Sequence, residues 1–148
     1  MKRLLTVAVL VCAAFLPMAY LGAHCEVPCG IYDDGARFTE MKEDQATIAK
    51  AIGQIVELAS THDATGHNQL ARWVATKEAH ATKTQHVIAQ YFMTQKIKAA
   101  DDHYVDKLKA AHAVMVAAMK CKQSADPATA DALKAAIASF EEAYTHAH

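Results

Sequence analysis

The sequence predicts an all-α fold, an antiparallel four-helix bundle, on three observations. Apolar residues recur every three or four positions in four long segments, which is the spacing of one helix face. Short polar stretches with turn or capping residues separate most of these segments, and no stretch alternates apolar and polar residues like a strand. Amphipathic helices of ~20 residues with short connections pack as an antiparallel bundle.

The first two helices are predicted in the middle of the chain. One begins near Arg37 and is broken by Thr61–Gly66. The next runs from about His67 to Phe92, and no strong stop signal follows it over Met93–Ala100. The residues expected to face the core are Met41, Ile48, Ile52, Ile55, Val56 and Ala59, then Leu70, Trp73, Val74, Ala81, Ile88 and Tyr91.

The last two helices follow from capping signals. Asp101 and Asp102 are good N-caps for the third helix. The stretch Cys121–Ala125 is expected to be a loop, and Asp126–Pro127 predicts a sharp start of the fourth helix. In the third helix the core-facing residues are expected to be Tyr104, Val105, Leu108, Ala111, Met115 and Ala118. In the fourth helix they are expected to be Leu133, Ala136, Ile137, Phe140 and Tyr144. The side chains of Trp73, Met41, Met115 and Met119 are all expected in the core.

The N-terminus has the pattern of a secretory signal. Lys2 and Arg3 precede the almost wholly apolar run Leu4–Ala23, which ends in small residues. We therefore expect residues 1–23 to be a cleaved signal peptide and residues 24–148 to form one domain of an exported protein, periplasmic or extracellular. Cleavage after Ala19 and retention of the 20-residue run as a membrane anchor are the alternatives.

Composition and charge narrow the function classes. The chain of 148 residues is 21% charged and 53% apolar, as in folded proteins with one core. Loss of Lys2 and Arg3 would take the formal net charge from −1 to −3, and no basic face or block of like charge predicts a nucleic-acid partner. Of the four cysteines, Cys12 lies in the leader and Cys121 is expected to be an inert buried thiol.

The remaining two cysteines lie beside the new chain start. Cleavage makes His24 the first residue, with a free amine. One metal ion can be bound in adjoining chelate rings by that amine, the next backbone nitrogen and the Cys25 thiolate. A turn helped by Pro28 and Gly30 can bring the Cys29 thiolate back to the same ion. Two nitrogens and two sulfurs in a plane, with the His24 imidazole on one side, favour nickel(II) or copper(II) over tetrahedral zinc. A Cys25–Cys29 disulfide without metal is the alternative.

The run His24-Cys25-Glu26-Val27-Pro28-Cys29-Gly30-Ile31-Tyr32-Asp33 resembles the nickel hook of nickel-containing superoxide dismutases, whose mature chain begins His-Cys-x-x-Pro-Cys-Gly-x-Tyr-Asp. Order, spacing and position after a processed leader all agree. The resemblance implies a homohexamer of four-helix bundles, each with an N-terminal metal-binding hook, here residues 24–34. It implies a nickel ion that cycles between Ni(II) and Ni(III) and disproportionates superoxide anion to oxygen and hydrogen peroxide.

The resemblance also implies roles for individual residues. His24 would supply the amine and an axial imidazole, Cys25 its backbone nitrogen and thiolate, and Cys29 the second thiolate. Tyr32 corresponds to the tyrosine that guards the open face of the metal. Glu40 corresponds to the glutamate that orients the histidine ring, a common form of support for a metal ligand.

A further support residue comes from the run Lys77-Glu78-Ala79-His80, which resembles a stretch where some members have arginine in place of His80. His80 would then share the ring-holding role. A leader this hydrophobic differs from the short propeptide of some relatives, so a general signal peptidase is the expected maturation peptidase.

Two other classes of function fit the same residues. One is an exported, non-catalytic helical protein that binds nickel or copper, and the other is a structural bundle with a disulfide and no metal. The enzyme hypothesis also needs a source of attraction for superoxide, because the net charge is negative. Lys77 and Lys83 are the candidates for local steering.

Overall fold

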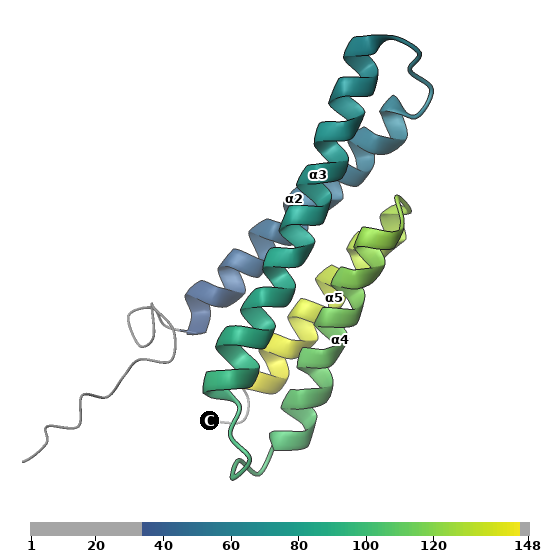
Figure 1. The fold of residues 1–148 in the computed structure, drawn as a ribbon. Helices are drawn as coiled ribbons and strands as arrows, with labels where there is room; N and C mark the ends of the chain where they lie inside the picture. Colours follow the sequence, from purple (N-terminus) through teal and green to yellow (C-terminus); the bar gives the residue numbers. More distant parts are fainter. Residues whose placement is uncertain (1–33, 146–148) are drawn as a thin grey trace, which may run out of the picture.

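The computed structural model describes residues 34–145, which form four long helical segments and contain no strand (Figure 1). The all-α prediction is therefore confirmed for this part of the chain. The expected signal peptide and all of the hook except Asp34 lie outside the described residues. The elements are α2 (Asp34–Leu58), α3 (Ala64–His86), the π-helix η1 (Val87–Lys96), α4 (Tyr104–Gln123) and α5 (Pro127–Thr145).

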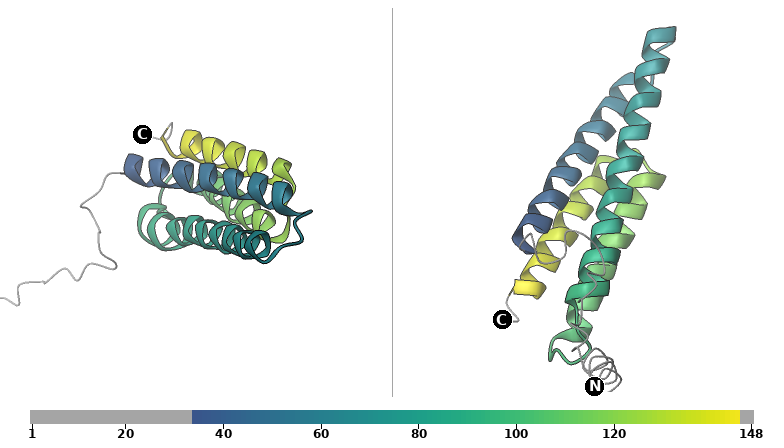
Figure 2. Two further views of the ribbon diagram at one scale, coloured as in Figure 1. Left: turned by 90° about the horizontal axis from the view of Figure 1, so that it is seen from above. Right: turned by 60° about the vertical axis from the view of Figure 1, so that its left-hand side comes forward.

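The helices are arranged as a bundle in which neighbours in sequence are neighbours in space. Helix α2 packs against α3 and α5, and α4 packs against the same two helices (Figure 2). The α2–α3 hairpin extends well beyond the α4–α5 pair at the end that carries the α2–α3 connection (Figure 1). The opposite end brings together the start of α2, η1 and the end of α5. This is the end at which the hook joins the bundle.

Helix α5 begins where the sequence predicts. Pro127 is its first residue, and the Asp126 carboxylate accepts a hydrogen bond from the amide of Ala128 at 2.9 Å. A proline is well placed there because the first turn of a helix has backbone amides without helical partners.

The predicted start of the third helix is wrong by a short distance. The N-cap of α4 is His103, not Asp101 or Asp102. The carboxylate of Asp101 instead accepts from the amide of His103 at 2.8 Å and pairs with the buried Lys107 ammonium at 2.6 Å. Asp101 therefore holds the connection against α4 rather than capping the helix.

The predicted loop Cys121–Ala125 begins too early, because α4 continues through Gln123 and only Ser124 and Ala125 of that stretch lie in the connection. Cys121 is fully buried, which fits a helical position facing the core. The Lys77 ammonium, from α3, donates to the carbonyls of Cys121 and Lys122, the latter at 2.7 Å. A cation is favourable at a helix C-terminus, where carbonyls have no helical partners.

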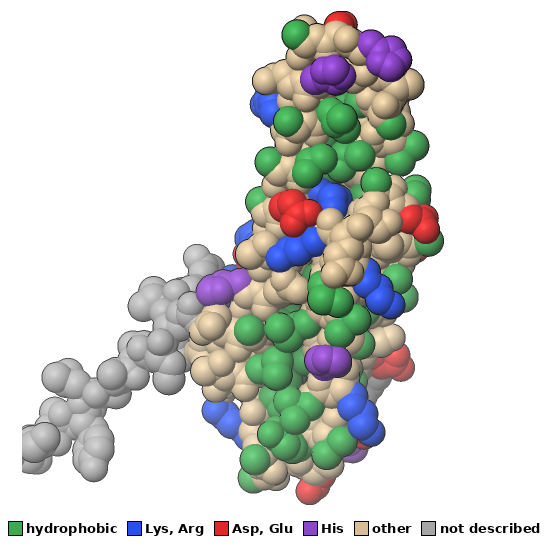
Figure 3. Space-filling view, turned by 45° about the vertical axis from the view of Figure 1, so that its right-hand side comes forward, with side chains coloured by type: hydrophobic (Ala, Val, Ile, Leu, Met, Phe, Trp, Pro, Cys, Tyr) green, Lys and Arg blue, Asp and Glu red, His purple; other side chains and the backbone are tan. Residues whose placement is uncertain are grey.

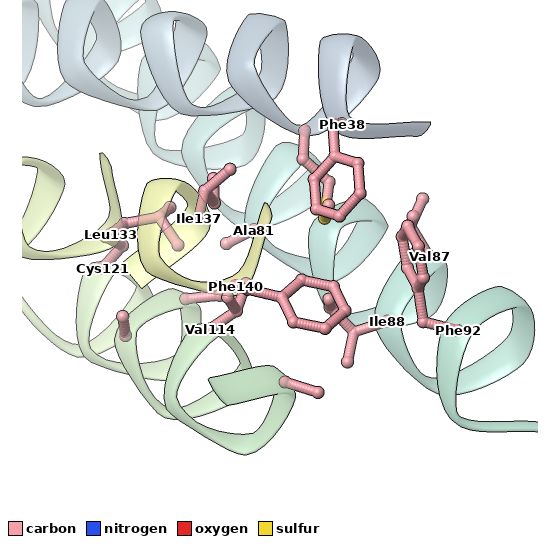
Figure 4. Packing of buried hydrophobic residues seen from close by; sticks show 14 of the residues in the cluster. Phe38, Ala81, Val87, Ile88, Phe92, Val114, Cys121, Leu133, Ile137 and Phe140 are labelled. Atoms are coloured by element: carbon pink, nitrogen blue, oxygen red, sulfur yellow. The ribbon is translucent and has the colours of Figure 1, made fainter. Parts of the chain in front are cut away.

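The core is built around aromatic side chains at the hook end of the bundle. Phe38 from α2, Phe92 from η1 and Phe140 from α5 converge there (Figure 4), with ring centroids 4.9–5.3 Å apart. Such tilted and edge-to-face pairs are favourable beyond the area they bury. Among residues 34–145, the other large apolar side chains that are fully buried are Met41, Ile48, Ile52, Ile88, Val114, Leu133 and Ile137.

Some predicted core residues are exposed. Val56 and Val74 lie in α2 and α3, and Val105 and Met119 lie in α4; Val56 is 54% exposed and Val105 56% exposed. The hairpin extends beyond α4–α5, so the part of α2 that holds Val56 has fewer helices to face. Apolar spacing identifies the helices but does not show which turns have a partner.

The π-helix η1 (Val87–Lys96) runs into the stretch Met93–Ala100, where no sharp stop signal was found. Its wider turn lets the amide of Ile97 donate to the carbonyl of Phe92 at 2.8 Å, five residues back. Two pairs of adjacent side chains in this helix, Val87–Ile88 and Tyr91–Phe92, are buried. Among the helices of residues 34–145, none is both long enough and apolar enough to cross a membrane.

Candidate metal centre

The structure describes the support residues of the predicted metal site but not its ligands. His24, Cys25, Cys29 and Tyr32 lie outside the described residues. Glu40 and His80 are described, on α2 and α3. Within residues 34–145, no group of three or more His, Cys, Asp and Glu side chains has the arrangement of a metal site.

Glu40 lies between two cations. The Lys83 ammonium is 3.0 Å from its Oε1, and the Arg37 guanidinium, one turn earlier on α2, contacts its Oε2. Burial raises the pKa of Glu40, but the hydrogen bonds and charges of Lys83 and Arg37 outweigh it, so the pKa lies below its ordinary value. Glu40 is therefore an ionised, oriented carboxylate.

His80 pairs with a residue that the sequence analysis did not single out. Its Nδ1 lies 2.6 Å from Oδ1 of Asp44, one turn beyond Glu40 on α2. Asp44 is only 1% exposed, whereas the His80 side chain is 33% exposed. The histidine therefore has one edge fixed in the helix interface and part of its ring at the surface.

Lys83 joins the two halves of this arrangement. Its ammonium lies 3.2 Å from Asp44 Oδ1 as well as 3.0 Å from Glu40 Oε1. Burial lowers the pKa of Lys83. The hydrogen bonds to Glu40 and Asp44 and the charges of these carboxylates raise it by a larger amount, so the pKa lies above its ordinary value. Together, Arg37, Glu40, Asp44, His80 and Lys83 form what we call the charged cluster.

One predicted steering residue is not available for that purpose. Lys77 is 4% exposed, and its ammonium is bound to the carbonyls at the end of α4 and to Glu78 at 3.1 Å. Its role is structural, which corrects the expectation for this lysine. The Lys83 side chain, by contrast, is 49% exposed, although its ammonium is paired with Glu40 and Asp44.

A second polar cluster lies where the hook joins the bundle. The Asp34 carboxylate accepts from the hydroxyls of Tyr91 at 2.6 Å and Tyr144 at 2.7 Å, and Lys96 lies 3.2 Å away. Burial raises the pKa of Asp34. These three partners lower it by a larger amount, so the pKa lies below its ordinary value. Burial and the Asp34 carboxylate raise the pKa of both tyrosines. The first residue of α2 is thereby fixed to η1 and α5.

The sequence holds a local signal for the role of Asp44 but none for that of Asp34. Asp44 follows Glu40 by four residues, and His80 precedes Lys83 by three, so each pair shares one helix face. Two acids on one helix and two bases on the next predict an interhelical cluster once the helices are known to be neighbours. Asp34 has no such local signal, because its partners are 57 and 110 residues away.

The family model of the nickel-containing superoxide dismutases matches residues 19–148, which include the hook and every described helix. The chain belongs to this family. It is thus a superoxide dismutase, an oxidoreductase that uses nickel as its metal and superoxide as its substrate. No curated protein and no solved structure matches the chain.

Proposed function

We propose that this superoxide dismutase acts as a mature chain beginning at His24, with nickel held by the hook. The His24 amine and imidazole, the Cys25 backbone nitrogen and thiolate, and the Cys29 thiolate form the donor set. Nitrogen and thiolate donors together fit nickel, and they stabilise its higher oxidation state. The bound nickel supplies one-electron chemistry by alternating between Ni(II) and Ni(III). Two superoxide anions and two protons give one oxygen and one hydrogen peroxide.

The position of the charged cluster is the observation that carries this proposal. Glu40 is six residues beyond Asp34, which is about 9 Å along a helix. Ten residues separate His24 from Asp34, and an extended chain of that length spans at most ~35 Å. His24 can therefore reach Glu40 and His80, the residues expected to orient its ring.

The remaining proposed roles follow from side-chain chemistry. Tyr32 carries a hydroxyl that can limit the approach to small anions and hydrogen-bond to them. Lys83 gives a partly exposed positive charge in the charged cluster, which favours an anionic substrate locally.

We also propose the maturation route and location. A general signal peptidase would remove residues 1–23, and the enzyme would be exported to the periplasm or outside the cell. The basic start and apolar run of the leader support this route. The domain of the mature enzyme would be residues 24–148, a hook of residues 24–34 followed by an antiparallel four-helix bundle.

The mature enzyme would assemble as a homohexamer, in keeping with the family. Large apolar side chains stay exposed in the single chain, among them Val56, Val74, Met93, Val105 and Met119. On the face shown in Figure 3, hydrophobic side chains extend along much of the molecule between charged ones. Subunit contacts would cover part of this apolar surface. Sedimentation of the nickel-loaded protein tests the assembly.

The test of the proposed function starts from the mature protein. N-terminal sequencing and metal analysis of native material should give His24 as the first residue and about one nickel per chain. Superoxide consumption should be lost in Cys29→Ser and in a variant with one extra residue before His24, because each removes a donor from the set. Nickel bound without turnover would instead indicate a metal carrier, and a Cys25–Cys29 disulfide without nickel would indicate a structural protein.

A further inference from the structure

We propose that Asp44 is a positioning residue that fixes the tautomer of His80, with the proton on Nδ1 and a lone pair on Nε2. The proposal rests on the proposed function, which makes His80 a support for the His24 ring. It adds a residue to that support and defines the hydrogen-bonding role of His80 as an acceptor. Its basis is the contact, burial and charge of residues on α2 and α3.

The contact itself defines the proton position. Asp44 Oδ1 lies 2.6 Å from His80 Nδ1. An ionised carboxylate only accepts hydrogen bonds, so Nδ1 must carry the proton that is shared. In a neutral imidazole the other nitrogen is then an acceptor.

Asp44 Oδ1 has a second partner besides His80. The Lys83 ammonium is 3.2 Å from the same oxygen and forms an ion pair with it. Among residues 34–145, Asp44 Oδ2 is buried and has no hydrogen-bond partner. His80 and Lys83 are thus the two partners on which this buried carboxylate depends, and loss of either is costly.

The tautomer matters because of what a metal-bound histidine needs. A histidine that coordinates through one ring nitrogen donates the N–H of the other to an acceptor, which fixes its orientation. A His80 with its proton on Nε2 would present a donor to another donor. Asp44 prevents this, so that His80 Nε2 is an acceptor that can share the remaining N–H of the His24 ring with the Glu40 carboxylate.

The test compares Asp44→Asn with the matched variant Glu43→Gln, an exposed acid at the adjacent position of α2. ¹⁵N-histidine NMR of the metal-free mature protein at pH 8, where an ordinary imidazole is neutral, reports the His80 tautomer directly. The wild type and Glu43→Gln should show the proton on Nδ1. In Asp44→Asn the new amide can donate to Nδ1, so the proton should shift toward Nε2.

Nickel content and superoxide consumption give the functional outcome. Loss of an outer-shell partner typically lowers metal affinity or activity 10–100-fold, and we expect a loss of this size in Asp44→Asn with none in Glu43→Gln. In a His80→Gln background, adding Asp44→Asn should cause little further loss, because Asp44 acts through His80.

Two results would overturn the proposal. One is a wild-type His80 with its proton on Nε2, which would make Asp44 the donor. The other is an unchanged tautomer in Asp44→Asn. The wild-type spectrum decides the first point even where the variant fails to fold. A chain without nickel-dependent activity but with the expected tautomer would contradict the proposed function and leave the pairing intact.

Discussion

At the scale of single residues, two carboxylates of α2, the half-buried Asp34 and the buried Asp44, tie this helix to its neighbours. Asp34 and Asp44 are each held by hydrogen-bond donors from other elements, and each has a lysine within 3.2 Å. A buried carboxylate without such partners would cost several kcal/mol. The effects of replacing them should therefore depend on ionisation.

The Asp34→Asn substitution should destabilise the bundle at neutral pH and much less in acid. The pKa of Asp34 lies below its ordinary value of 3.8, so its carboxylate stabilises the folded state above about pH 4. This contribution is lost as the pH falls through the folded-state pKa. Urea unfolding should show a cost of about 1–3 kcal/mol at pH 7 that shrinks toward pH 3.

The control for this experiment is Asp106→Asn, since that carboxylate is exposed on α4 and 3.8 Å from its lysine partner. It should cost little at either pH. A constant effect of Asp34→Asn from pH 7 to pH 3 would mean that its charge does not stabilise the fold.

Phe92→Ala should be one of the most damaging core substitutions. Phe92 is fully buried, and its ring packs against Phe38, Tyr91, Phe140 and Tyr144. Truncation of a phenylalanine at such a site costs about 3–5 kcal/mol through lost burial and the cavity left behind. Chemical denaturation monitored by circular dichroism measures this cost. A loss below 1 kcal/mol would show that the core collapses around the gap.

At the scale of elements, two glycines in the α2–α3 hairpin should respond in opposite ways to alanine. A Cβ at Gly53 meets nothing within 4 Å, so Gly53→Ala should stabilise α2 by about 0.5–1 kcal/mol. A Cβ at Gly66 would lie 1.8 Å from Thr61 Oγ1 and 2.6 Å from Thr61 Cβ. Gly66→Ala should therefore lower the melting temperature, and Thr61→Gly should restore part of the loss. Equal effects of the two alanines would contradict this geometry.

The end of α4 should depend on a residue from another helix. Lys77→Met removes the donor to the carbonyls of Cys121 and Lys122 and leaves them without that partner. We expect a loss of about 1–3 kcal/mol and faster amide exchange in the last turn of α4. Lys134→Met, at an exposed position of α5, is the control and should have little effect. Unchanged exchange in Lys77→Met would show that the cap is not needed.

The sequence predicts the helices better than their ends because periodicity is a local property. The start at Pro127 follows from local capping chemistry and is confirmed. The last turn of α4 is contacted by Lys77, which lies 44 residues from Cys121 and has no local signal. In the same way, Glu40 and His80 could be named from motif resemblance, whereas Asp44 becomes evident only when α2 and α3 are placed side by side.

At the scale of the whole molecule, the described helices bury a shared hydrophobic core built from residues between Phe38 and Tyr144. We expect this core to hold the helices together without the metal. Removal of nickel with a chelator should leave the helical content of the mature protein nearly unchanged while superoxide consumption is lost. Far-ultraviolet circular dichroism before and after chelation checks this. A large loss of helix would show that the metal site contributes to folding of the bundle.

The burial of Cys121 has a practical consequence for thiol chemistry. Its side chain is fully buried, its Sγ donates to the carbonyl of Thr129 at 3.3 Å, and burial raises the pKa of the thiol. Alkylating reagents should thus modify this cysteine only when the helices open. Rapid labelling of the folded protein would report on cysteines elsewhere in the chain, and the slow phase would measure how often the bundle opens.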